Sequence, residues 1–82
     1  MATYHCVNIL KSKSNPRRHC TGRTTDLEKR LIAHNFGQVR HTAECRPWQI
    51  ETAISFRSRL KASKFEAYLK SHSGRAFASK YF

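Results

Sequence analysis

Residues 3–10 alternate between two sets of side chains, as a β-strand does. One set is Tyr4, Cys6, Asn8 and Leu10, and the other is His5, Val7 and Ile9. This pattern predicts a strand with one apolar face. The polar run 11–17 contains Asn15-Pro16, a turn signal, and residues 18–23 fit a second short strand. The two segments are close enough in sequence to pair as an antiparallel hairpin.

A helix is predicted directly after this hairpin. Thr25-Asp26-Leu27-Glu28 matches the capping box, in which the threonine and glutamate side chains each accept from the other's backbone N–H. The helix should run to about Asn35 and end before Gly37, which can adopt the left-handed C-cap conformation. Arg30 and His34 are four residues apart and therefore lie on one helix face. Leu27 and Leu31 should anchor the buried face.

The second half of the chain predicts a third strand and two more helices. A basic, polar loop at 38–47 precedes a strand at 48–56, whose alternate residues from Trp48 to Phe56 should share one face. Ser58 can cap a helix running to about residue 71, Gly74 should break it, and residues 75–82 suit a last short helix. The prediction is one α+β domain over residues 1–82, with a three-stranded antiparallel sheet in the order β-β-α-β-α-α. Its largely buried core should contain Leu31, Trp48, Ile50, Phe65 and Leu69.

The charge of the chain indicates which class of molecule it binds. Sixteen Lys and Arg stand against five acidic residues, for a formal net charge of +11. Self-repulsion of this size is offset by an anionic partner, and nucleic acid is the partner that the charge favours. An anionic membrane surface would need a basic helix with a wide apolar face, and no segment has that pattern cleanly. No segment approaches the ~20 apolar residues of a membrane span. The first residues lack the pattern of a signal peptide, so we expect a cytoplasmic protein.

Three residues suggest chemistry. Glu66 lies within the apolar stripe of the second helix, where it either pairs with a nearby lysine or binds a divalent cation. Arg30 and His34 form either a solvated basic face or a phosphate-binding cation beside a titratable imidazole. An arginine, a histidine and a metal-binding carboxylate together suit phosphodiester hydrolysis.

The cysteines leave one alternative open. Cys6, Cys20 and Cys45 show no CxxC spacing, and small buried or half-buried thiols are the favoured interpretation. A zinc site formed by Cys6, Cys20 and a histidine is the alternative.

Several motifs occur together in this chain, and their combination is more specific for a protein family than any one of them alone. They are Val7-Asn8-Ile9-Leu10-Lys11-Ser12 on the first strand, Cys20-Thr21-Gly22-Arg23-Thr24 on the second, the helix segment 25–35, Arg46-Pro47-Trp48, and the segments 65–70 and 73–78. The chain resembles the GIY-YIG nuclease family over nearly its whole length, and Arg46-Pro47-Trp48 and the segments 65–70 and 73–78 match small bacterial stand-alone members. The resemblance implies a divalent-metal-dependent endonuclease that acts on DNA with Mg²⁺ or Mn²⁺ and without a small-molecule substrate.

The resemblance also implies roles for individual residues. Arg30 would be the catalytic arginine, Glu66 the metal ligand and His34 the helix histidine. Gly22 would be the glycine that permits the backbone turn beside the site. Further nucleic-acid contacts are expected from Arg23, Lys29, Arg40 and Arg46, together with Gly22.

The chain departs from the family at both motif tyrosines. Asn8 and Cys20 stand where the family has phenols that help to position and deprotonate the attacking water. Asn8 cannot act as a base, whereas a cysteine loses its proton more readily than a phenol. The leading hypothesis is therefore a weakened endonuclease in which His34 assists the water. The alternative is a nucleic-acid-binding module without catalysis on the same scaffold.

Overall fold

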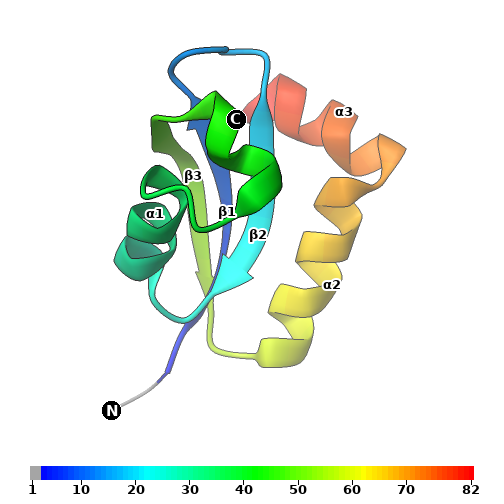
Figure 1. Ribbon diagram of the computed structural model, residues 1–82. Coiled ribbons are helices and arrows are strands. Elements are labelled where there is room, and N and C mark those ends of the chain that lie inside the picture. The colour runs from blue at the N-terminus through cyan, green and yellow to red at the C-terminus, as the bar shows by residue number, and fades with distance from the viewer. Residues whose placement is uncertain (1–2) are drawn as a thin grey trace.

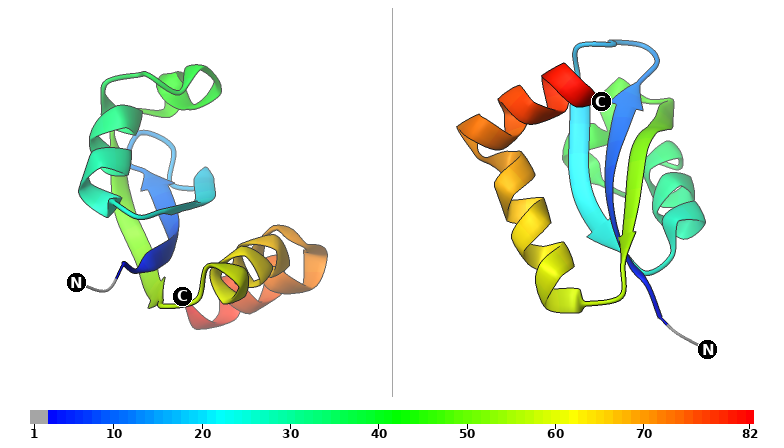
Figure 2. Two further views of the ribbon diagram at one scale, coloured as in Figure 1. Left: turned by 90° about the horizontal axis from the view of Figure 1, so that it is seen from below. Right: turned by 180° about the vertical axis from the view of Figure 1, so that it is seen from behind.

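A three-stranded antiparallel sheet forms the centre of the protein. The structure, a computed structural model, describes residues 3–82. The strands β1 (His5–Ser12), β2 (His19–Thr24) and β3 (Trp48–Phe56) are arranged in the order β2-β1-β3 (Figure 1). The helices α1 (Leu27–Asn35) and η1 (Arg40–Cys45) cover one face, and α2 (Arg59–Lys70) and α3 (His72–Tyr81) cover the other (Figure 2). The predicted α+β class and element order are confirmed, with the short helix η1 added within the predicted loop.

The central strand β1 is buried on both faces. Val7 and Ile9 pack with Ala62 and Leu69 of α2 in the main hydrophobic cluster. Leu10 points to the opposite face and is 0% exposed. The prediction of a single apolar face is wrong, because β1 lies between two other strands and beneath helices on both sides. Its polar positions are consequently enclosed as well.

A bulge at Glu51 divides β3 into two parts. Ile50 and Thr52, on either side of Glu51, pair with adjacent residues of β1, so that Glu51 is an extra residue in the ladder. The side chains before and after the bulge therefore face opposite sides of the sheet. Trp48 packs against the α1 side and Phe56 against α2. The predicted common face along 48–56 is wrong for this reason.

The predicted core is correct in part. Trp48 and Leu69 are buried, with 3% and 4% of their surfaces exposed. Leu31 and Phe65 are half-buried. Ile50 is exposed, at 39%, so its assignment to the core is wrong. The bulge places it opposite Leu10 on the α1 face of β3, which is an edge strand of the sheet.

The ends of α1 follow the predicted signals with one change. Asp26 is the N-cap residue, and its side chain accepts from the Lys29 N–H at 3.0 Å. The capping box between Thr25 and Glu28 is therefore wrong, because the helix begins one residue later. Gly37 has the predicted left-handed conformation, with φ of 74°.

The junction between α2 and α3 is tighter than the sequence suggested. Ser58 caps α2 as predicted, and Ser71 caps α3 by accepting from the Gly74 N–H at 3.1 Å. Gly74 thus lies in the first turn of α3, so its predicted role as the helix breaker is wrong. A Cβ at Gly74 would overlap the Tyr68 carbonyl, and glycine is what allows the two helices to meet.

Candidate active site

Arg30 of α1 reaches across to the β1–β2 hairpin. Its Nε donates a hydrogen bond of 2.6 Å to Oδ1 of Asn8, which is 1% exposed. Gly22 lies opposite Asn8 in the hairpin, and a Cβ at this position would overlap the Arg30 guanidinium. Gly22 therefore makes room for the arginine. The expectation that it permits a turn is wrong, because Gly22 lies within β2 and has no positive φ.

Cys20 of β2 lies between Arg30 and His34. The Sγ atom of Cys20 is 3.5 Å from Nη2 of Arg30, which donates to it, and 3.6 Å from Nε2 of His34. Nδ1 of His34 lies 3.1 Å from the Arg30 carbonyl oxygen, which can only accept. In the neutral ring Nδ1 therefore carries the proton, and Nε2 is left to accept a proton from the Cys20 thiol.

The environment of His34 favours its neutral form. The side chain is 3% exposed, and its ring meets Trp48 edge-on at a centroid distance of 6.2 Å. Burial is the main cause that lowers the pKa of His34; the hydrogen bond to the Arg30 carbonyl opposes it, and the positive charges of Arg30 and His41 lower it further. An imidazole without a proton on Nε2 is therefore available beside the thiol at neutral pH.

Glu66 lies on the other face of the sheet. Its carboxylate accepts from Lys70 Nζ at 3.0 Å and lies 3.8 Å from Nε of Arg23. Arg23 follows Gly22 in β2, so its side chain points to the face opposite the Arg30 guanidinium. Within residues 3–82 no hydrogen bond or ion pair joins Glu66 to Arg30. The predicted lysine pairing of Glu66 is confirmed through Lys70.

Four side chains thus meet in one cluster, those of Asn8, Cys20, Arg30 and His34. Glu66 lies outside this cluster, on the other side of strand β2. We refer to these four residues as the Arg30 cluster.

The carboxylate that would bind a metal ion at this site is that of Glu66. Over the described range 3–82, no three His, Cys, Asp or Glu side chains are grouped as metal ligands. A magnesium ion commonly takes one or two carboxylates and completes its shell with water and substrate phosphate oxygens. Glu66, with 19% of its side chain exposed, fits an ion shared with the substrate and does not form a closed protein site.

The zinc alternative gains no support from the hairpin register. Cys6 pairs with Thr24, whereas Cys20 pairs with Leu10, so the two cysteines lie well apart along the hairpin. Their side chains do not converge on one point.

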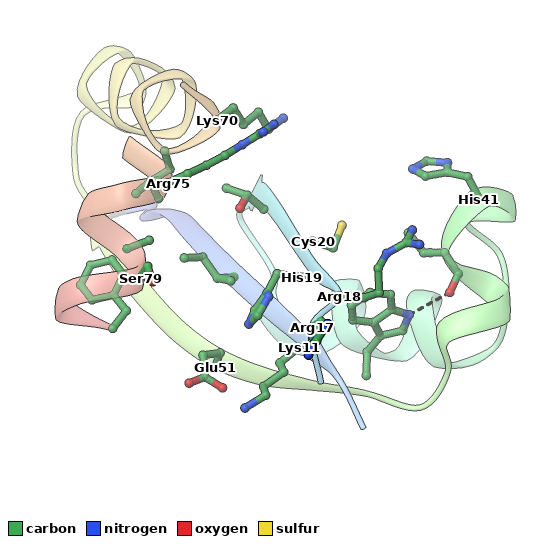
Figure 3. Close-up of a pocket in the computed structure, with 17 residues that line it drawn as sticks. Lys11, Arg17, Arg18, His19, Cys20, His41, Glu51, Lys70, Arg75 and Ser79 are labelled. Atoms are coloured by element: carbon green, nitrogen blue, oxygen red, sulfur yellow. Dashed lines mark hydrogen bonds between the residues drawn. The ribbon is translucent and has the colours of Figure 1, made fainter. Parts of the chain in front are cut away.

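A basic cleft of about 830 Å³ adjoins the Arg30 cluster through Cys20 (Figure 3). It lies between the hairpin, η1 and α3. Its cationic side chains are Lys11, Arg17, Arg18, Lys70 and Arg75. His19 and His41 also line it, and Glu51 is the acidic residue among its lining.

The cations predicted to contact nucleic acid lie elsewhere. Arg23 pairs with Glu66. Lys29, Arg40 and Arg46 are exposed on α1, at the start of η1 and just after it. None of these four residues lines the cleft. Sequence reasoning missed the cleft residues, although the adjacent pair Arg17-Arg18 directly before the second strand was an available signal.

Comparison with known families identifies the family to which the chain belongs. The family model described as the GIY-YIG catalytic domain matches residues 4–81. The chain therefore belongs to the GIY-YIG family, a family of nucleases. No curated protein matches the chain significantly. Within residues 3–82 there is no helix with the length and hydrophobicity needed to cross a membrane.

Proposed function

We propose that this protein is a divalent-metal-dependent endonuclease that hydrolyses phosphodiester bonds in DNA. The observation that carries the proposal is the Arg30 cluster, in which a fixed guanidinium and a neutral imidazole contact the same thiol. The family membership supports the nuclease class. The net charge of +11 supports a polyanionic substrate.

Arg30 would stabilise the negative charge that develops on the phosphoryl oxygens. Asn8 binds its Nε, and this contact holds the guanidinium in an orientation in which Nη2 donates to Cys20. A donor held in advance of the reaction needs no reorganisation when the charge develops. Asn8 therefore acts as a positioning residue and not as a base.

Cys20 and His34 would activate the attacking water. Nε2 of His34 accepts the Cys20 proton, and the resulting thiolate accepts a proton from the water as its oxygen attacks phosphorus. The P–O bond to the leaving oxygen breaks in the same step. The proton held by His34 is then transferred, directly or through solvent, to the leaving alkoxide, so that Cys20 and His34 both return to their starting forms. This pair would replace the phenols found elsewhere in the family.

Glu66 would hold Mg²⁺ or Mn²⁺ against the scissile phosphate. When bound, such an ion supplies Lewis-acid polarisation of a phosphate oxygen. The carboxylate must then exchange its contact with Lys70 for the ion, and the flexible lysine side chain, 53% exposed, can move away.

Nicking of supercoiled plasmid in Mg²⁺ or Mn²⁺ tests this proposal. Arg30→Ala should lower the initial rate by about 10²–10³-fold, as the loss of one oxyanion donor does in other enzymes. Glu66→Gln should abolish metal-dependent nicking. Glu44→Gln removes an exposed acid of η1 and serves as the matched control, which should nick at the wild-type rate.

The second candidate function is a DNA-binding module without catalysis. The replacement of both motif tyrosines by Asn8 and Cys20 favours it. DNA binding by a wild-type protein that nicks no plasmid in either metal would establish this alternative and overturn the nuclease proposal.

A further inference from the structure

The basic cleft collects cations from segments that are distant in the sequence. Lys70 and Arg75 lie on one side of the cleft, and Arg18 and His41 lie on the other, with His19 and Cys20 between them (Figure 3). Arg18 belongs to the hairpin turn, and Arg75 belongs to α3. A polyanion in the cleft would therefore be held from both sides.

We propose that this cleft binds a single-stranded segment of the DNA substrate. The inference rests on the proposed function for the identity of the polymer. It adds that the bound DNA is single-stranded. It also adds a binding site formed by residues other than Arg23, Lys29, Arg40 and Arg46.

The shape of the cleft favours a single strand over a duplex. Its volume of about 830 Å³ lies within the range of pockets that bind small ligands. Duplex DNA is commonly read by a helix or ribbon that projects into its major groove. Here the cations line a hollow instead, which a narrow, flexible strand can enter.

Exposed rings in the cleft support the same choice. His19, His41 and Phe82 line it, and Phe82 is 39% exposed. Sites for single strands combine a positive groove with rings on which unpaired bases stack. In a duplex the bases already stack on one another, so these rings would have no partner.

The cleft also leads to the reacting groups. Cys20 lines the cleft and contacts both Arg30 and His34. A strand bound between Arg18 and Arg75 therefore passes beside the thiol. The preferred substrate would be DNA with an unpaired stretch next to the cleavage position, such as a fork.

Binding without metal tests the inference independently of cleavage. The probes are a labelled 20-nucleotide single strand, the matching blunt duplex and a forked duplex, each with EDTA present. The wild-type protein should bind the single strand and the fork more tightly than the blunt duplex. Arg18→Ala/Arg75→Ala should weaken single-strand binding about tenfold or more and lower the log–log salt slope by about 1.4, for two phosphate contacts.

Two further variants make the test specific. Lys61→Ala/Lys64→Ala removes the same charge from exposed positions of α2 outside the cleft, and it should keep the wild-type preference and slope. His19→Ala removes an exposed ring and no cation, and it should weaken the single strand about fivefold without a comparable loss for the blunt duplex. Melting curves confirm that each variant is folded.

The results separate this inference from the proposed nuclease function. Equal affinity for the blunt duplex and the single strand would overturn the inference, as would equal losses in the cleft variant and the α2 variant. Plasmid nicking could still occur in that case. A single-strand preference that depends on Arg18 and Arg75 in a protein that cuts nothing would support the inference and overturn the nuclease proposal.

Discussion

The Nε atom of Arg30 and the Oδ1 atom of Asn8 are joined by a hydrogen bond of 2.6 Å between α1 and the central strand. The amide of Asn8 is oriented by a second bond, in which its Nδ2 donates to the Cys6 carbonyl at 3.2 Å. Both ends of the Asn8 amide are therefore engaged, the oxygen with Arg30 and the nitrogen with the backbone of its own strand.

The role of the hydrogen bond between Arg30 and Asn8 can be tested by changing its acceptor, Asn8. Asn8→Leu keeps a similar volume but leaves the Arg30 Nε without a partner, which should cost about 1–3 kcal/mol of unfolding free energy and lower the nicking rate. Asn8→Asp keeps an acceptor oxygen, so it should retain both properties better. Chemical denaturation and initial nicking rates measure the two effects. Equal nicking by Asn8→Leu and the wild type would show that Asn8 does not position Arg30.

Restoring one tyrosine tests how the water is activated. Cys20 is partly exposed at the cleft, so Cys20→Tyr can be accommodated, whereas Asn8 is enclosed and a larger side chain there would overpack the core. If a phenol is the better group, Cys20→Tyr should nick plasmid faster with unchanged DNA affinity, because the gain is confined to the transition state. Cys20→Ser should nick more slowly than the wild type. A restored tyrosine without any gain would mean that the Cys20–His34 pair already suffices.

The buried histidine predicts a pH dependence of stability. The folded-state pKa of His34 is lowered, mainly by burial, so the unfolded chain binds more protons than the folded protein below about pH 6.5. The free energy of unfolding should therefore fall as the pH is lowered through and below that value. Thermal melts from pH 7.5 to 5 measure the effect, which should be smaller in His34→Gln. Exposed His72 provides the control, and a slope altered equally by His72→Gln would contradict the assignment.

Two leucines of α2 form a matched pair for the core. Leu69 is 4% exposed within the main cluster, whereas Leu60 is 64% exposed. Leu69→Ala should cost about 2–5 kcal/mol of unfolding free energy, a large share of the total for a domain of this size. Leu60→Ala should change it by less than about 0.5 kcal/mol. Urea denaturation compares them, and similar losses would show that the cluster is wrongly placed.

The parts of the fold that follow from local signals could be predicted from the sequence. The strand 48–56, the Ser58 cap and the left-handed Gly37 depend on neighbouring residues, and all three are as predicted. The element order followed from the same patterns. The burial of β1 on both faces did not, because it depends on which strand is central.

Features that depend on strand pairing or on distant contacts could not be predicted in the same way. The bulge at Glu51 is a mismatch between two strands, and alternation within one strand does not reveal it. The contact of Cys20 with both Arg30 and His34 requires α1 to pack on β1 and β3, so that its side chains reach the neighbouring strand β2. The cleft likewise requires α3 to return to the hairpin, which places Arg75 across the cleft from Arg18.

Because of the bulge at Glu51, the two parts of β3 pack against different regions of the protein. The part before it carries Trp48, which supports the ring of His34, and the part after it carries Phe56, which belongs to the α2 core. A substitution of Trp48 should therefore affect both the packing and the orientation of His34, whereas a substitution of Phe56 should affect the packing on the α2 side. A single strand thus supports the reacting groups with its first part and the main hydrophobic cluster with its second.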